Sequence, residues 1–306
     1  MIPLVKRRLL QAARFILDVP ILFSTRKVFM LPNIKGVRFS RRWMAFKYSC
    51  NYLAKSFTSQ CRGECLINHY SFLNSNMTKE AINNIAKNEI TLWEDPVGDD
   101  IFSISLRIPI HDLEGDLCLT FYVGLVQIYY MSFTIIDGRI FGIPEPNVIF
   151  ITRVQGASGQ FQLIKRATTK LDDVSPVSML FTTVQAISKA FGLKNIVGIT
   201  AKEQVVLSDM EPSDRFMNSY DNFWNSIGAK MINHMAYKLP TGPRRTNQCV
   251  VKSNHRCRTK YKRNFKFLVY SQILDTFRQQ CLNPSHAEAR PAEQRILLQQ
   301  GICSGD

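Results

Sequence analysis

The chain has 306 residues, 45% of them hydrophobic, and a formal net charge of +15. This composition predicts a folded protein of one large or two small domains, and it excludes a disordered or low-complexity chain. Eight cysteines in a chain of this length are too few for a disulfide scaffold, and no apolar run is long enough to cross a bilayer.

The start of the chain has basic residues ahead of apolar ones, as a signal peptide does. Arg14 and Asp18 interrupt the apolar part, however, and no clear cleavage site follows. We therefore expect an uncleaved protein in the cytoplasm, which becomes peripheral to the inner membrane if its basic start binds there.

The basic charge is concentrated in two segments. Residues 1–62 contain thirteen Lys and Arg against one acid, and residues 238–267 contain ten and no acid. The rest of the chain is mildly acidic. Such segregation predicts an anionic partner, which can be a membrane surface, a nucleic acid or the phosphates of a cofactor.

The first part of the chain is predicted to be a basic helical region over residues 1–95. Residues 4–17 fit a basic amphipathic helix, which either lies at a membrane interface or packs on the protein's own core. Residues 33–57 continue the mixture of basic and aromatic residues. A short helix over residues 77–88 begins at Thr78, which is a good N-cap residue.

From about residue 101 the pattern predicts an antiparallel meander of strands. Its turns are expected at residues 114–116 and at Asp137-Gly138, a strong hairpin signal, and Gly124 marks a bulge or bend. The expected strands are residues 102–109, 117–136, 138–143 and 147–154.

Helical spacing then returns and alternates with strands. Ser175-Pro176 is typical of a helix start and Gly192 of a helix end, and the strand at 196–200 follows. This order predicts a crossover that places residues 196–200 beside the meander. A helix over residues 220–227 and a single strand over 231–239 complete the pattern.

The predicted fold is α/β (α+β), with a mixed, largely antiparallel sheet and packed helices in a core domain of residues 96–270. A C-terminal helix and a polar tail follow, over residues 271–306. No linker cleanly divides the chain into two domains.

The segment RVQGASG, residues 153–159, follows a predicted strand and precedes helix-compatible sequence. A glycine-rich turn at a helix start lets backbone N–H groups approach an anion. The segment resembles the loop with which GNAT-type N-acyltransferases hold the pyrophosphate of acyl-CoA, and the element order is compatible with a GNAT-like fold. An ordinary strand-to-helix turn is the alternative. The resemblance implies acyl-CoA as a cofactor and a binding set of Arg153, Gln155, Gly156, Ser158 and Gly159.

Other chemical motifs are scarce. The sequence has no nucleophile elbow, no phosphate loop of the P-loop type and no zinc spacing, so we expect no metal site. His69 and His111 have no positioned partner. The basic segment around residues 252–267 is either an anion-binding surface or a solvated helix, and no motif for sequence-specific nucleic-acid binding accompanies it. Its expected anion-binding residues are Arg256, Arg258, Lys260, Lys262 and Arg263.

Several segments, taken in order, resemble the VirK/YbjX family of enterobacterial proteins. They include HYSFL, EGDLCLTF, RVQG, the motif SYDNFWNSIG at 219–228, YKLP and RCRTKYKRNF. The segment at Asp172 departs from the basic sequence expected in this family. Within the SYDNFWNSIG motif we predict that Tyr220, Phe223 and Trp224 are core residues, and that Asp221 contacts the basic segment 252–267.

The resemblance implies a virulence-associated accessory protein. Such a protein supports the expression or correct surface localisation of an outer-membrane virulence factor, and it acts from inside the cell. No catalytic residue comes with this resemblance. The alternative is a GNAT-like acyltransferase that acts on a protein or an envelope component. A nucleic-acid-binding regulator is a third hypothesis, and it predicts salt-sensitive affinity.

Overall fold

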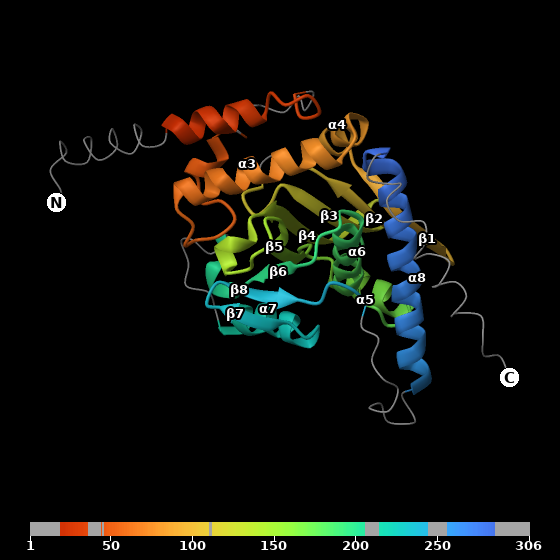
Figure 1. The fold of residues 1–306 in the computed structure, drawn as a ribbon. Coiled ribbons are helices and arrows are strands. Elements are labelled where there is room, and N and C mark those ends of the chain that lie inside the picture. The colour runs from red at the N-terminus through yellow and green to blue at the C-terminus, as the bar shows by residue number, and fades with distance from the viewer. Residues whose placement is uncertain are drawn as a thin grey trace.

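The computed structural model describes residues 19–35, 44, 46–109, 112–205, 214–243 and 256–284, without the side chains of 214–219 and 256–258. Eight strands form one mixed sheet in the order β1-β2-β3-β4-β5-β6-β8-β7, with helices packed around it (Figure 1). The strands are β1 (Ile90–Val97), β2 (Asp100–Arg107), β3 (Leu117–Val123), β4 (Val126–Ile136), β5 (Val148–Gly156), β6 (Ile196–Ile199), β7 (Lys230–Asn233) and β8 (Ala236–Leu239).

The helices surround this sheet. In Figure 1, α3 runs above the sheet, α7 lies below β8, and α8 stands along the right-hand side next to α6. None of the helices in the described part of the chain is long and apolar enough to span a bilayer. Their bounds are α3 (Ser59–Asn76), α4 (Lys79–Lys87), α5 (Phe161–Lys170), α6 (Pro176–Ala190), α7 (Asp214–Ser226) and α8 (Arg256–Cys281).

The mixed α/β fold and the crossover are confirmed. Strands β1 to β5 are consecutive and antiparallel, as a meander requires. The next strand, β6, is parallel to β5, because α5 and α6 carry the chain back before it begins. The last two strands form an antiparallel hairpin whose second strand, β8, adds to β6.

The predicted ends of α4 and α6 also hold, whereas α7 begins before the expected residue 220 and α8 begins before the expected residue 271. Thr78 caps α4 by accepting a hydrogen bond from Ala81 N, and Ser175 caps α6 by accepting one from Ser178 N. Gly192 follows α6 with φ +71°, a conformation that side chains with a Cβ rarely adopt. These local signals depend on residues within one turn, so the sequence alone reveals them.

Four expected strand boundaries were wrong. The sheet starts at Ile90, because β1 and β2 form a hairpin at Gly98, with φ +64°. The 117–136 run is two strands, since Gly124 makes a hairpin turn rather than a bend. Asp137 caps a short 3-10 helix, η2 (Gly138–Phe141), so it starts no tight hairpin and no strand follows it. The 231–239 strand is also a hairpin, β7 and β8.

The two faces of the sheet are covered by different parts of the chain. Phe150 on β5 stacks on Phe57, which precedes α3, with ring centroids 6.1 Å apart. The next pair along these strands is Ile151 and Gly198, and it faces the opposite side of the sheet. There α7 packs so closely that a Cβ on Gly198 would lie 2.9 Å from the Trp224 side chain. Buried apolar residues from Val28 to Leu282 form one continuous core.

The chain before α3 docks on this core. Residues 19–28 are helical, and Ile21 lies so close to α3 that a Cβ on Gly63 would sit 2.2 Å from its Cγ1. Phe29 packs on Tyr70 with ring centroids 4.7 Å apart. The basic helix predicted at residues 4–17 lies outside the described residues.

Candidate functional site

The end of β5 extends beyond its neighbour β6. Strand β6 pairs only with Ile149, Phe150 and Ile151, whereas β5 continues to Gly156. Beyond Ile151, the edge of β5 that faces away from β4 has no strand partner among the described residues. At the point of separation, Gln204 Nε2 donates to Thr152 O at 2.7 Å. An open strand edge with exposed peptide groups is a place where an extended ligand can add.

The predicted glycine turn lies at this open end. Gly156 pairs with Tyr129 of β4, Gly159 has φ +76°, and α5 begins two residues later. The N-cap residue Gln160 makes no capping hydrogen bond through its side chain. Within the turn, Ala157 N donates to Ile128 O at 2.9 Å and Gln160 N donates to Ala157 O at 3.2 Å. The N–H groups at the start of α5 have no side-chain cap and suit an anion. Ser158 and Gly159 are exposed there.

Arg153 joins the turn to two acids in the segment that precedes β3. Its Nη1 lies 3.3 Å from Asp112 Oδ2 and its Nε lies 3.4 Å from Glu114 Oε2. The same Nε donates to Gln155 Oε1 at 3.0 Å, and the guanidinium lies over the ring of Tyr130. Arg153 is therefore held by the two acids on one side and by Gln155, next to the turn, on the other.

Glu114 is the titratable group of this cluster. Its burial raises its pKa to about 7, although Arg153 acts in the opposite direction, and the negative charge of Asp112 adds to the rise. The carboxylate of Asp112 already accepts a hydrogen bond, since Ser132 Oγ donates to its Oδ2 at 3.0 Å. A carboxylate that titrates near neutral pH is suited to accept and return a proton.

Tyr220 approaches the same cluster from α7. The residue is 7% exposed, and its pKa is well above the usual value, through burial first and then the nearby charge of Glu114. A hydrogen bond with the Gln204 side chain acts in the opposite direction. The phenol thus stays protonated at neutral pH, whereas the carboxyl group of Glu114 exchanges its proton in that range.

The aromatic residues of the SYDNFWNSIG motif on α7 pack in the core, as predicted. Trp224 is fully buried and donates from Nε1 to Ile199 O at 2.8 Å, and Phe223 packs against the core. The predicted contact of Asp221 with the basic segment is not found among the described residues. Its Oδ1 accepts from Ala201 N at 3.1 Å, because α7 lies against the 3-10 turn after β6, and it pairs with no basic residue of the described part of α8.

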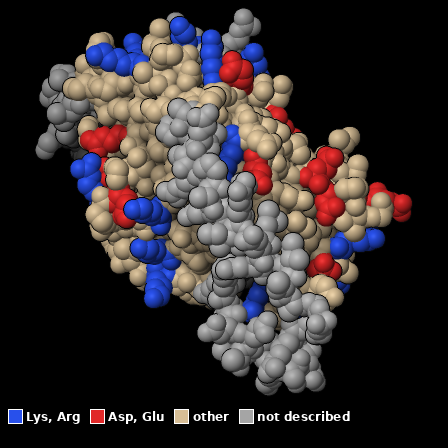
Figure 2. All heavy atoms as spheres, turned by 45° about the vertical axis from the view of Figure 1, so that its right-hand side comes forward, with Lys and Arg blue, Asp and Glu red and all other residues tan. Residues whose placement is uncertain are grey.

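The predicted anion-binding residues lie on the first half of α8. Lys260 is exposed, Lys262 lies 3.9 Å from Asp173, and Arg263 lines a cavity described below. Arg256 and Arg258 begin the helix, and their side chains lie outside the described atoms. On the face shown in Figure 2, the acidic side chains lie mostly to the right and the basic ones mostly to the left and above.

Comparison with known proteins gives a family. The family model described as "Protein of unknown function (DUF535)" matches residues 5–276, most of the chain. The chain belongs to the DUF535 family. No curated protein and no solved structure matches it.

The DUF535 chain has a second polar cluster, which is fully buried. Asp116 accepts hydrogen bonds from Lys47 Nζ at 2.8 Å, from Tyr70 Oη at 3.3 Å and from the hydroxyl of Tyr52. Beside it, His69 Nδ1 accepts from Ile135 N at 3.0 Å, and burial lowers its pKa to about 4. His69 is therefore a neutral core residue whose Nδ1 is occupied, and it is not a free base.

The described part of the chain has no cluster of potential metal ligands. In that part, no three His, Cys, Asp or Glu side chains are placed to hold a metal ion. Cys61 and Cys65 lie on adjacent turns of α3, and both are free thiols.

Sequence reasoning missed most of the acids and hydrogen-bonding groups at this site. It singled out Arg153 and the turn but treated residues 114–116 only as a bend in the chain. The two acids spaced two apart, Asp112 and Glu114, were the available signal, because an aspartate accepts readily from the N–H two residues on, as Asp112 Oδ1 does from Glu114 N at 2.7 Å. Gln204 carried no sequence signal of its own.

Proposed function

We propose that this DUF535 protein is an acyltransferase that takes an acyl group from acyl-CoA and transfers it to a nucleophile on a protein or an envelope component. One observation carries the proposal. On β5, Arg153 pairs with Glu114, a carboxylate with a pKa of about 7, and three residues further on the same strand ends at the glycine turn before the uncapped start of α5.

The turn and the strand edge account for donor binding. Backbone N–H groups at the exposed Ser158 and Gly159 and at the start of α5 would hold the phosphates of the donor. The open edge of β5 would pair with its extended, amide-containing arm. The arrangement agrees with the GNAT-like resemblance, in which the loop leaves a strand of an antiparallel meander. Gln155 and Ser158, both exposed, border the same turn.

The acids account for the chemistry. An amine or hydroxyl of the acceptor attacks the thioester carbonyl, a C–N or C–O bond forms, and the C–S bond breaks. Glu114 takes the proton that the acceptor loses, and this proton balances the thiolate that leaves. Arg153 positions Glu114.

Calorimetry with acetyl-CoA tests donor binding. Ser158→Asp places a negative charge on the exposed turn, and Ser158→Asn is its neutral control of nearly equal size. We expect the aspartate variant to bind acetyl-CoA about tenfold more weakly or worse, and the asparagine variant to bind as the wild type does. Absence of binding in the wild type, or equal binding by all three proteins, would refute the proposal.

A thiol-release assay tests the step itself. With acetyl-CoA and a panel of amines, we expect Glu114→Gln to lower the rate about 100-fold or more while donor affinity stays unchanged. The wild-type rate should rise with pH through about 7, as the carboxyl of Glu114 loses its proton. A rate that does not depend on Glu114 would remove its role as a base.

For the biological role, we propose the one that the resemblance to the VirK/YbjX family implies. The match to the DUF535 family supports this resemblance. Within that role, the protein would work from the cytoplasm or at the inner membrane on the production or surface placement of an outer-membrane virulence factor. The two basic segments supply contacts to an anionic surface. A deletion strain that keeps normal amounts and surface distribution of such factors would contradict this role.

A further inference from the structure

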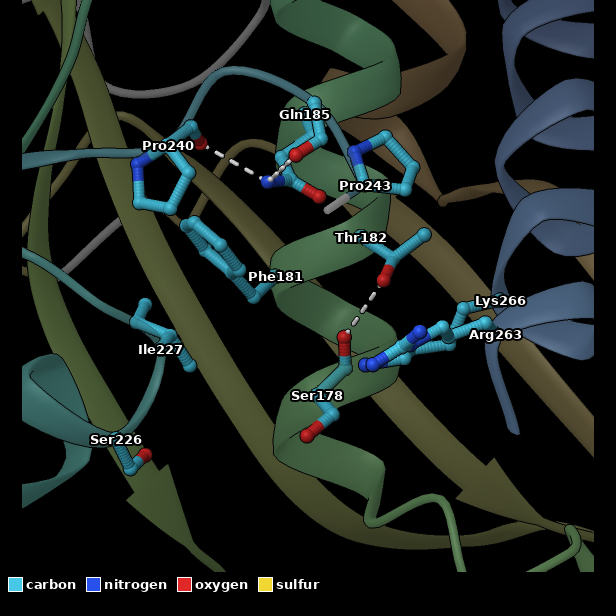
Figure 3. A pocket seen from close by; sticks show the side chains of 11 residues that line it. Ser178, Phe181, Thr182, Gln185, Ser226, Ile227, Pro240, Pro243, Arg263 and Lys266 are labelled. Carbon is cyan, nitrogen blue, oxygen red and sulfur yellow. Dashed lines mark hydrogen bonds between the residues drawn. The ribbon is translucent and has the colours of Figure 1, made fainter. Parts of the chain in front are cut away.

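A separate cavity of about 300 Å³ lies between α6, the end of α7, the segment after β8 and α8 (Figure 3). It shares no residue with the glycine turn or with the Glu114 cluster. Its size is at the lower end of the range for small-molecule sites. The residues that line it come from four segments far apart in the chain: Ser178, Phe181, Thr182 and Gln185; Ser226 and Ile227; Pro240, Gly242 and Pro243; and Arg263 and Lys266.

One end of the cavity is cationic. Arg263 and Lys266 are three residues apart on α8, so they lie on the same side of that helix. In Figure 3 both side chains extend toward Ser178 of α6. Helix α8 is fixed at this level, since Phe265 packs on Trp93 of β1 with ring centroids 6.4 Å apart. Two cations on a fixed helix next to a hydroxyl form a site suited to a phosphate or a similar anion.

The other end of the cavity is apolar and already formed. Phe181 is 5% exposed, and Ile227, Pro240 and Pro243 complete this wall. The segment after β8 is held in place because the buried Gln185 donates from Nε2 to Pro240 O at 2.9 Å and to Gly242 O at 3.0 Å. A preformed wall of this kind lowers the cost of ordering upon binding.

We propose that this cavity binds a small organic phosphate, with its phosphate between Arg263, Lys266 and Ser178 and a short apolar group against Phe181 and Ile227. The proposal does not depend on acyl transfer at Glu114. A nucleic-acid strand or a membrane surface would need a wider array of cations than a cavity of this volume presents. The phosphate has two possible sources, an acyl-CoA donor or a separate phosphorylated molecule.

Phenyl phosphate is the probe, because it combines a phosphate with a compact apolar ring. Calorimetry on the full chain should show binding of phenyl phosphate, weaker binding of inorganic phosphate, and none of phenol up to about 10 mM. The double variant Arg263→Ala/Lys266→Ala should bind phenyl phosphate at least about tenfold more weakly. The charge-matched control, Lys87→Ala/Lys194→Ala, removes two exposed lysines outside the cavity and should bind as the wild type does.

A second variant fills the cavity without removing charge. A Cβ on Gly242 would meet no atom within 4 Å, so Gly242→Leu is expected to fold and to occlude the apolar end. It should abolish phenyl phosphate binding while the melting temperature stays within a few degrees of the wild type. Phenyl phosphate binding that survives in both Gly242→Leu and the Arg263/Lys266 variant overturns the proposal, as does absence of binding in the wild type.

Competition assigns the source of the phosphate. If coenzyme A displaces phenyl phosphate, the cavity holds a phosphate of the donor. If both bind together, the cavity belongs to a separate phosphorylated ligand. The Ser158→Asp variant keeps this result apart from the proposed acyl transfer, because the charge at the turn should weaken acetyl-CoA binding and leave phenyl phosphate binding unchanged.

Discussion

Glu114 and Asp116 stand two residues apart, and the fold shifts their pKa values in opposite directions. Burial raises the pKa of Glu114 to about 7, and one arginine, itself shared with Asp112, only partly offsets the rise. Burial alone would also raise the pKa of Asp116, yet the charge of Lys47 and the hydrogen bonds from Lys47 and Tyr52 hold it below its usual value.

The difference lies in how completely each carboxylate is compensated. Asp116 has a lysine at 2.8 Å and hydroxyl donors around it, so its charged form is stable inside the core. Glu114 lies at the open end of β5 with a single shared cation, so it exchanges a proton near neutral pH. The first cluster therefore stabilises the fold, while the second is suited to chemistry.

Removal of the cation from each cluster should give the largest contrast. Lys47→Ala leaves Asp116 as a buried, uncompensated charge and should lower the free energy of unfolding by about 3–5 kcal/mol. Arg153→Ala should cost about 1 kcal/mol or less, because Glu114 can take up a proton instead. Urea unfolding followed by circular dichroism measures both.

The double variant Lys47→Ala/Asp116→Asn is the control for this contrast. It removes the stranded charge and should recover part of the loss. Equal losses for Lys47→Ala and Arg153→Ala would show that the two clusters do not differ as described.

Local signals in the sequence predicted a large part of the fold. The caps at Thr78 and Ser175, the helix end at Gly192 and the crossover between β5 and β6 depend on short segments or on element order. Strand β1 was missed because acids and Pro96 interrupt its alternation, and its pairing with β2 compensates for them.

The sites were harder to predict than the fold. Lys47 and Asp116 are 69 residues apart, and Thr152 and Gln204 are 52 apart, so only the folded chain brings them together. The turn at Gly156 was visible because its residues are consecutive. The pKa of its acidic partner, Glu114, could not be read from the sequence, because a value near 7 arises from burial and not from residue type.

His69 offers a pH-dependent test of the buried cluster. The folded protein binds its proton only near pH 4, whereas the unfolded chain does so near 6.5. The stability from this group is therefore full above pH 6.5 and is lost as the pH falls toward 4, by about 3 kcal/mol. His69→Asn keeps an acceptor for Ile135 N and should lose less stability over this range. Parallel pH profiles for the two proteins would refute the assignment.

Glu114 should give the opposite slope, with a smaller effect. The folded protein keeps its proton up to about pH 7, whereas the unfolded chain releases it near 4.5. The stability from this group is full below pH 4.5 and is lost as the pH rises through 7, by about 3 kcal/mol in all, of which about 2.5 kcal/mol falls between pH 5 and pH 8. Glu114→Gln cannot ionise, so its unfolding free energy should change less than that of the wild type between pH 5 and pH 8. Urea titrations at both pH values measure the difference, and a wild type that loses no more stability than the variant would place Glu114 in the fully compensated class with Asp116.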